Sequence, residues 1–348
     1  MPDASTSASD GLRQEVRAFL TEASPPSEVR RLMETDLGYD PAVWGEMVAR
    51  GWPSLPIPEL AMVVEEAGAA LLCAPLLGTA AARATIAEDW DPAAVVALAV
   101  AEDSGRWEAE GVTLRATPSP TGGGEWRLDG HKSFVVDGWV ADTLLVAGRA
   151  TTDGGVGLFL VERDAPGVGH TRLATVDLTR QQTRVELSAT PARRVGDEPA
   201  CDRLLDVAVT LLAAEQVGGA RRCLEMTVDH LRRRVQFGRP IGSFQAVQHR
   251  CAEMLVDVES ARSASAWATA TAASPSASAD LPQAAATAKV TCSEAYAFVA
   301  GETIHLHGAL GFTWDHDAHL YFKRAKSSRQ LFGDPRFHRQ RLFRLLDL

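Results

Sequence analysis

An arginine-rich turn is the first part of the sequence with distinctive chemistry. The stretch "RRRVQFGRPIGSFQAVQHRCAEM" places three consecutive arginines, Arg232 to Arg234, ahead of an aromatic-glycine pair and a proline. Each guanidinium offers fixed bidentate donors of the kind that phosphate groups require. Arginines near a helix C-terminus also complement the helix dipole, and this interpretation without a ligand stays open for Arg232 and Arg233.

Glu215 is the best-placed carboxylate for a catalytic base. It stands in the apolar stretch "LAAEQVGGA", where burial would raise its pKa toward a useful range. The alternative is an ion pair with an arginine such as Arg221 or Arg222. The "TWDHDAH" stretch also holds acidic and histidine side chains, but a metal would need further ligands that the linear sequence does not show.

Composition favours a cytoplasmic globular enzyme. The 348 residues, 46% of them apolar, are enough for a large core. With a net charge of −10, the surface repels nucleic acid and anionic membranes, so neither is expected as a partner. The five cysteines lack disulfide or zinc-site spacing, and no run of about 18 apolar residues occurs, so we expect reduced thiols and no membrane span.

The elements that must position these residues begin with helices. Asp10 is predicted as an N-cap because apolar residues follow it at helical spacing, and further helices are predicted around Ala42–Arg50 and Leu60–Leu72. The proline-rich "WPSLPIPEL" between the last two should not be helical.

From about Val95 the pattern changes to short alternating strands. "EWRLDGHKSFVVDG" has apolar alternation on both sides of Asp129-Gly130, which predicts a hairpin turn at that pair. Further β-branched runs follow, so an antiparallel β region is expected to end near residue 195.

Helical spacing returns after Leu204. "QFGRP" ends the first long helix, a second is predicted over Phe244–Thr271, and Pro282 fits the first turn of a third. A final helix is predicted at Asp317–Arg329. The predicted domains are a helical domain, a β domain and a helical bundle, at residues 1–94, 95–197 and 198–348.

This order of elements, with the arginine-rich motif and "HLHGALGFTWDHDAHLYFKRA", resembles the acyl-CoA dehydrogenase family over nearly the whole chain. The resemblance implies an α+β fold with an N-terminal helical domain, a middle antiparallel, barrel-like β domain and a C-terminal four-helix bundle. It also implies FAD as cofactor and an acyl-CoA thioester as substrate. In that family the Arg-x-x-Phe-Gly turn of one subunit reaches the FAD diphosphate that is held mainly by its neighbour.

The resemblance assigns cofactor contacts to two segments. Arg234 would hold the diphosphate, and the turn after it would let Gln245 face the cofactor. In "HLHGALGF" the glycines would let backbone amides approach the other part of the dinucleotide, although His305 stands where a glutamine is usual and Ala309 where a glycine is usual. The implied cofactor-binding residues are Arg234, Phe237, Gly238, Gln245, His305, Gly308 and Gly311.

The positions expected around the reacting carbon atoms depart from the family pattern. The usual base is a glutamate in a turn that here looks like "LFGDP", which places Phe332 at that position. Some members take the base from a position that falls near Ala208 here, which is no carboxylate either. Ala101 and Val136 stand where the family places hydroxyl residues against the flavin ring.

Three functions follow from this pattern. The leading hypothesis is an acyl-CoA dehydrogenase-like subunit of fatty-acid or steroid-side-chain degradation. It would share an FAD site with a homologous subunit that carries the catalytic glutamate, in a heterodimer or an α2β2 assembly. The second is a self-sufficient dehydrogenase, able to form a homo-oligomer, with Glu215 or Asp334 as base. The third is a flavin-free structural or interaction subunit.

Overall fold

The computed structural model describes residues 4–120 and 124–347 and divides the chain into two compact units. The helical unit comprises Met1–Arg31, Pro56–Leu72 and Val209–Leu348, and the sheet unit comprises Leu32–Leu55 and Cys73–Ala208. Each unit therefore combines segments that are distant in sequence. The observed mixture of helices with one large sheet confirms the expected α+β class, whereas the division into three consecutive domains stays a prediction.

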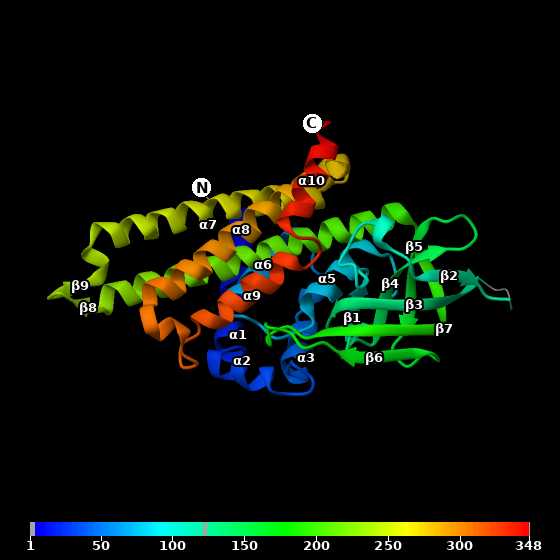
Figure 1. The fold of residues 1–348 in the computed structure, drawn as a ribbon, viewed down its shortest axis with the longest axis horizontal. Coiled ribbons are helices and arrows are strands. Elements are labelled where there is room, and N and C mark those ends of the chain that lie inside the picture. Colours follow the sequence, from blue (N-terminus) through cyan, green and yellow to red (C-terminus); the bar gives the residue numbers. More distant parts are fainter. Residues whose placement is uncertain (1–3, 121–123, 348) are drawn as a thin grey trace. The chain divides into compact units, whose positions relative to one another are not determined.

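The helical unit is built mainly from long helices (Figure 1). They are α1 (Ala4–Ala23), α2 (Pro26–Met33, whose end enters the sheet unit), α4 (Ile57–Ala69), α6 (Glu198–Arg233, which begins in the sheet unit), α7 (Gln245–Ala273), α8 (Leu281–His307), α9 (Ala318–Gln330) and α10 (Pro335–Leu345). Short 3-10 helices η3 (Ile241–Ser243), η4 (Pro275–Asp280) and η5 (Gly308–Phe312) and a two-stranded hairpin, β8 (Val235–Gln236) and β9 (Arg239–Pro240), connect them. No helix in the described ranges is long and apolar enough to cross a membrane.

The centre of the helical unit is the middle of α6, which is buried at every position from Val209 to Ala220. A helix that is buried all round needs small residues where neighbours approach closely. The core that α6 shares with α7 and α8 is accordingly dominated by alanine; its members are Ala213, Val217, Ala261, Ala268, Ala284, Ala288, Cys292 and Ala295. Small side chains thus let three long helices pack tightly.

The sheet unit holds seven paired strands (Figure 1). The strands are β1 (Val96–Ala99), β2 (Arg115–Pro118), β3 (Glu125–Val136), β4 (Thr143–Ala150), β5 (Val156–Glu162), β6 (Val168–Arg172) and β7 (Gln182–Gly196). They are accompanied by α3 (Pro41–Ala49), α5 (Leu76–Thr85) and the 3-10 helices η1 (Trp52–Ser54) and η2 (Ala109–Gly111). The strand order is β1-β4-β2-β3-β7-β5, β4 also pairs with β5, and β6 pairs with β7, so the pairings from β4 round to β5 close into a ring.

Two expectations about the strands are wrong. Asp129-Gly130 is no hairpin turn, because β3 runs straight through it and pairs with β7, with a bulge between Leu128 and Gly130. Asp129 instead accepts a hydrogen bond at 2.8 Å from the backbone of Ala189, and Gly130 adopts a positive φ of 141° close to Leu114. The region is also not purely antiparallel, since β4 pairs in parallel with both β1 and β2.

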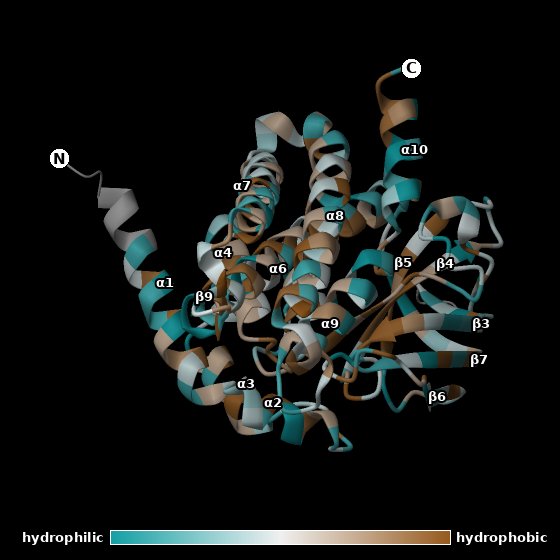
Figure 2. Cartoon of the chain, turned by 60° about the vertical axis from the view of Figure 1, so that its left-hand side comes forward, coloured by the Kyte–Doolittle hydropathy of each residue, from teal (hydrophilic) through white to brown (hydrophobic). Residues whose placement is uncertain are grey.

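Most predicted helices are present in the structure, but some of their first or last residues were predicted wrongly. The helices at α3, α4, α7, α8 and α9 are confirmed within a few residues. Asp10 lies inside α1 rather than at its start, and α4 begins at Ile57, within the proline-rich stretch, because Pro58 fits a first helical turn. The helix at Asp317–Arg329 is not the final one: α10 follows it, with hydrophilic and hydrophobic residues in alternation (Figure 2).

Candidate functional site

The arginine-rich motif forms the end of α6 and the tight hairpin of β8 and β9. Val235 pairs with Pro240 and Gln236 with Arg239, so Phe237 and Gly238 form a two-residue turn. Both have positive φ, 54° and 75°, as the hairpin turn that matches strand twist requires. A positive φ is unfavourable for a non-glycine residue such as Phe237. The side chain of Phe237 is also 91% exposed to solvent.

The surroundings of this hairpin fit an anion-binding role for Arg234. Its side chain is exposed at the C-terminal end of α6, and its carbonyl accepts a hydrogen bond at 2.8 Å from Ile241, which fixes the chain reversal. The guanidinium of Arg239 instead stacks over the ring of Phe244 at 4.0 Å. Gln245 is exposed at the first position of α7. The hairpin therefore presents Arg234 and Gln245 from consecutive helices.

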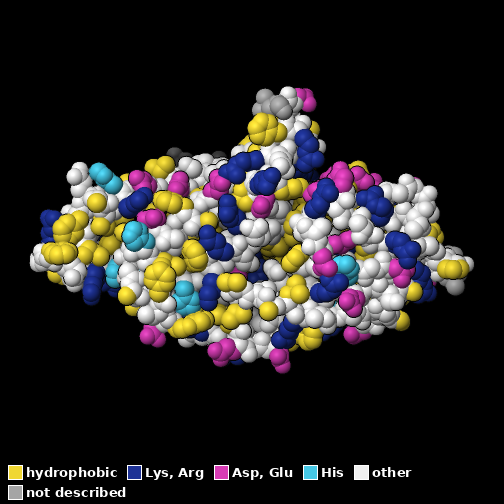
Figure 3. Space-filling view, in the orientation of Figure 1, with side chains coloured by type: hydrophobic (Ala, Val, Ile, Leu, Met, Phe, Trp, Pro, Cys, Tyr) yellow, Lys and Arg dark blue, Asp and Glu magenta, His cyan; other side chains and the backbone are white. Residues whose placement is uncertain are grey.

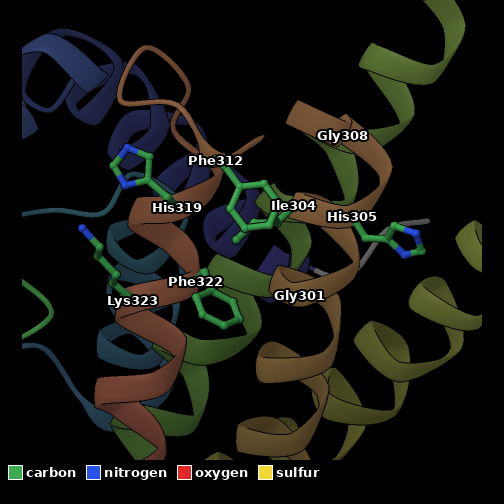
Figure 4. A pocket seen from close by; sticks show the side chains of 8 residues that line it. All are labelled: Gly301, Ile304, His305, Gly308, Phe312, His319, Phe322 and Lys323. Atoms are coloured by element: carbon green, nitrogen blue, oxygen red, sulfur yellow. The ribbon is translucent and has the colours of Figure 1, made fainter. Parts of the chain in front are cut away.

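A largely apolar pocket of about 620 Å³ lies where α8, η5 and α9 meet (Figure 4). It is lined by Gly301, Ile304, His305, Gly308, Phe312, His319, Phe322 and Lys323. The pocket therefore includes two of the predicted cofactor residues, His305 and Gly308. Figure 4 shows His305 directed away from Phe312 and His319, and 73% of its side chain is exposed.

Gly308 and Gly311, the two predicted glycines of this segment, are required for different structural reasons. Gly308 ends α8 with φ 62° and ψ −141°, a conformation that is practically reserved for glycine. A Cβ at Gly308 would meet no atom within 4 Å, so this backbone faces open space. A Cβ at Gly311 would lie 2.8 Å from the carbonyl oxygen of Ile304, so Gly311 permits close packing of η5 on α8.

The position expected for the catalytic glutamate is closed. Phe332 is only 3% exposed and has a positive φ of 58°. Gly333 follows with φ 94°, and a Cβ there would lie 2.4 Å from the ring of Phe337. Asp334 caps α10, because its carboxylate accepts a hydrogen bond at 2.8 Å from the backbone of Phe337.

Two buried side chains hold this turn in place. The ammonium of Lys289 donates to the carbonyls of Ser328 and Arg329, at 2.6 and 3.3 Å, and so caps the C-terminal end of α9. The Nε2 atom of His338 lies 2.9 Å from the carbonyl oxygen of Phe332, and burial lowers the pKa of His338 to about 3. A neutral His338 therefore donates to the turn at physiological pH.

Glu215 is buried and lies in an ion pair. Its Oε1 atom is 3.2 Å from Nη1 of Arg324, and the two side chains are 8% and 3% exposed. The alternative interpretation, an ion pair with an arginine, is therefore confirmed, although the partner is Arg324 and not Arg221, which lies against Glu66 at 2.8 Å. The candidate base thus belongs to a charge pair between α6 and α9.

The resemblance places two hydroxyl-bearing residues beside the flavin ring, at positions that are Ala101 and Val136 in the sheet unit. Ala101 is fully buried and Val136 nearly so, and neither carries a hydroxyl group. Next to Ala101, Glu102 lies 2.9 Å from Lys132. Burial disfavours a charged Glu102, but hydrogen bonding from Thr113 and the charge of Lys132 outweigh this and lower its pKa to about 2. Its hydrogen bonds to the backbone of Thr113 and Leu114 serve the fold of this unit.

The donor set therefore fits only part of FAD. Arg234 and the open backbone at Gly308 suit a diphosphate and the adenosine end, whereas Ala101 and Val136, if they face the isoalloxazine as the resemblance implies, would offer it no side-chain hydrogen bonds. The structure also shows residues that sequence patterns missed, namely Lys289, Arg324 and His338. Lys289 could have been noticed in the sequence, because it is a charged residue inside an alanine-rich helix. No sequence pattern pointed to Arg324 or His338.

Comparison with known proteins gives consistent matches. The family model for the acyl-CoA dehydrogenase C-terminal domain matches residues 201–346. Acyl-CoA dehydrogenase IpdE2 of Mycobacterium tuberculosis is 37% identical over 339 residues, which cover 93% of this chain and 93% of that protein.

Two solved complexes contain chains of the same fold. A chain of the Tcur3481-Tcur3483 steroid ACAD has a TM-score of 0.88 and 30% identity, and the alignment covers 98% of both chains. A chain of the ChsE4-ChsE5 complex from Mycobacterium tuberculosis has a TM-score of 0.87 and 28% identity, with 98% of this chain and 97% of that chain covered.

Proposed function

Since the chain belongs to the acyl-CoA dehydrogenase family of oxidoreductases, we propose that it is the non-catalytic type of subunit in a heteromeric flavoenzyme. The assembly would introduce a double bond between the α and β carbons of an acyl-CoA thioester. The partner, a homologous subunit, would supply the glutamate that removes the α proton.

The observation that carries this proposal is the closed turn at Phe332. An apolar ring cannot accept a proton, and the turn is held by Lys289, His338 and the capping carboxylate of Asp334. Rebuilding it to bring Asp334 to a substrate would break the cap of α10. Glu215 is engaged by Arg324, so neither alternative carboxylate is available without losing a structural contact.

The residues of this chain would serve the partner's cofactor. When bound, FAD would accept the hydride from the β carbon. Arg234 would hold the diphosphate by bidentate hydrogen bonds, Gln245 would add a polar contact, and the backbone at Gly308 would admit the dinucleotide closely. The lack of hydroxyl groups at Ala101 and Val136 supports a flavin ring that sits in the partner.

Two observations favour a heteromeric assembly. Two of the similar solved structures are described by pairs of chain names, ChsE4-ChsE5 and Tcur3481-Tcur3483. On this chain, apolar residues of α7 are exposed, including Leu255 at 50% and Val256 at 64%. Exposed apolar surface of this kind is typical of subunit interfaces. A steroid side chain or a fatty acid, as its CoA thioester, is the proposed substrate.

The test is the amount of FAD per polypeptide, measured from the flavin absorbance of the purified chain alone and after co-expression with a homologous subunit that carries the glutamate turn. We expect little FAD on the chain alone and about one per heterodimer. Arg234→Ala should lower the FAD affinity of the heterodimer by about 10- to 100-fold, because a charge-assisted bidentate contact is lost.

Arg232→Ala is the matched control, since Arg232 is an exposed arginine on the same helix end, and it should leave FAD content unchanged. Stoichiometric FAD on the chain alone, bleached by an acyl-CoA, would contradict the proposal and favour a self-sufficient enzyme. Absence of FAD from every assembly would favour a structural subunit.

A further inference from the structure

Three histidine rings of the helical unit pack in sequence, with His307 in contact with both His230 and His316; we call this group the histidine stack. The rings of His230 and His307 have centroids 4.4 Å apart and are inclined by 29°. The rings of His307 and His316 are also 4.4 Å apart, inclined by 49°. His307 lies in the middle and is only 6% exposed. The stack thus joins the end of α6, the end of α8 and the segment after η5.

Both predicted cofactor segments are attached directly to this stack. The backbone N–H of Arg234 donates to the carbonyl oxygen of His230 at 2.8 Å, so the arginine follows His230 by one helical turn. His307 is the residue immediately before Gly308, where α8 ends. Figure 3 shows histidine and hydrophobic side chains close together on the left-hand part of the surface in that view. Phe237, Phe312 and Trp314, in or next to the two segments, are exposed.

The middle ring remains uncharged at neutral pH. Burial, together with the neighbouring His316 and His230, lowers the pKa of His307 to about 4, although a contact of 2.7 Å between its Nδ1 atom and the carbonyl oxygen of Thr303 opposes the shift. Neutral rings can stack at van der Waals distance, whereas charged ones would repel each other.

The outer rings face other charged groups. Burial, then His316, Arg234 and Arg233, lower the pKa of His230. The pKa of His316 is lowered by burial and by Arg30, against the raising effect of Asp317. Arg30 and Asp317 are themselves paired at 2.7 Å. Cations near both ends of the stack thus favour the neutral imidazoles.

We propose that His307 is a positioning residue: in contact with both His230 and His316, it holds the turn at Gly308 against the last turn of α6, so that Arg234 and the 308–311 backbone act on the same ligand. This inference rests on the proposed function for the identity of that ligand. The link between residues 234–245 and 308–313 exists in this chain whatever the ligand is. The flat ring of His307 positions the two segments, and its protonation is not required.

The test combines a ring deletion with a ring-preserving change. His307→Ala removes the middle of the stack, and His307→Phe keeps a flat ring without an ionisable group. Hydrogen exchange of the purified chain should become at least tenfold faster in His307→Ala in both residues 234–245 and 308–313, and His307→Phe should restore most of the protection. Strand β5 in the sheet unit serves as the internal control.

The second readout is FAD affinity of the heterodimer. His307→Ala should weaken it about tenfold or more, His307→Phe should stay within about threefold of wild type, and His170→Gln in the sheet unit should have no effect. Unchanged exchange at residues 234–245 in His307→Ala would overturn the positioning role, whatever the FAD result. If His307→Ala speeds exchange in both segments as expected, but the wild-type heterodimer binds no FAD, the positioning role stands and only the proposed function is refuted.

Discussion

Glu215 and Arg324 illustrate how one distant contact changes the meaning of a residue. A carboxylate in an apolar helix is a candidate base while it lacks a partner, because burial then favours its neutral form. The nearby guanidinium of Arg324, at 3.2 Å, favours the charged form and supplies a structural role. At the residue scale, the pair explains why a buried glutamate can exist here without catalysis.

Substitutions of Glu215 and Arg324 distinguish a structural role of the pair from a catalytic role of Glu215. Glu215→Gln should lower the free energy of unfolding by about 3–5 kcal/mol, because the buried Arg324 loses the charged carboxylate that it faces at 3.2 Å. The double variant Glu215→Leu/Arg324→Met should be close to wild type in stability, since both charges are removed. The measurement is urea denaturation of each variant.

The double variant also tests the alternative enzyme. It should retain the turnover of the heterodimer, assayed by acyl-CoA-dependent reduction of an electron acceptor. A stable double variant without turnover would identify Glu215 as the base and contradict the proposed division of labour.

At the scale of elements, Gly218 lets α6 approach α4 closely. A Cβ at Gly218 would lie 1.7 Å from the carbonyl oxygen of Glu65, and that oxygen belongs to helix backbone that cannot swing aside. The next glycine, Gly219, similarly faces the ring of Tyr296, at 2.4 Å from a Cβ. The glycine pair therefore allows the close approach of α6 to α4 and to α8.

Gly218→Ala should destabilise the protein by about 3 kcal/mol or more, because α4 has to move as a unit. The matched control is Gly45→Ala in α3, where a Cβ meets nothing within 4 Å. This exposed helical position should gain about 0.5–1 kcal/mol from the better helix propensity of alanine. Thermal unfolding of the two variants would compare them directly, and equal destabilisation would contradict the packing argument.

Sequence patterns predicted elements well where local rules are sufficient. Helical spacing and the proline at Pro282 located α7 and α8, since both depend on residues within a few positions of each other. The Asp129-Gly130 pair misled because strand pairing with β7 placed it in a bulge. A hairpin turn and a bulge both suit glycine, and only the position of the partner strand distinguishes them.

At the scale of the whole molecule, a charge network ties the three segments of the helical unit together. Glu66 of α4 receives hydrogen bonds from Arg17 of α1 and Arg221 of α6, each at 2.8 Å. Burial would raise the pKa of Glu66, but the hydrogen bond from Arg17 and the charge of Arg221 outweigh it and lower the pKa. The contribution of this network to stability is complete above the ordinary pKa of 4.5 and is lost as the pH falls through the lower folded value.

Glu66→Gln should therefore reduce the free energy of unfolding by about 2 kcal/mol at pH 7, a figure discounted because Arg17 is half-exposed. Below pH 4.5, the ordinary pKa of this carboxyl, the difference between wild type and variant should shrink. Denaturation between pH 7 and pH 3 measures it. Glu46→Gln, which removes an exposed pair with Arg50, should change stability by less than about 0.5 kcal/mol. A constant difference at all pH values would contradict the assignment.

The sequence by itself determined the family motifs, the main helices and the residue types at the positions that the family resemblance assigns to catalysis. Those features depend on residue identity or on neighbours in the chain, so Phe332 could be predicted at the expected base position without coordinates. Tertiary structure alone decided the partner of Glu215, which is 109 residues away, and the stacking of His307 between two other histidines. Such contacts form between segments that only the packed core brings together, and no local period encodes which distant side chain will face a given residue.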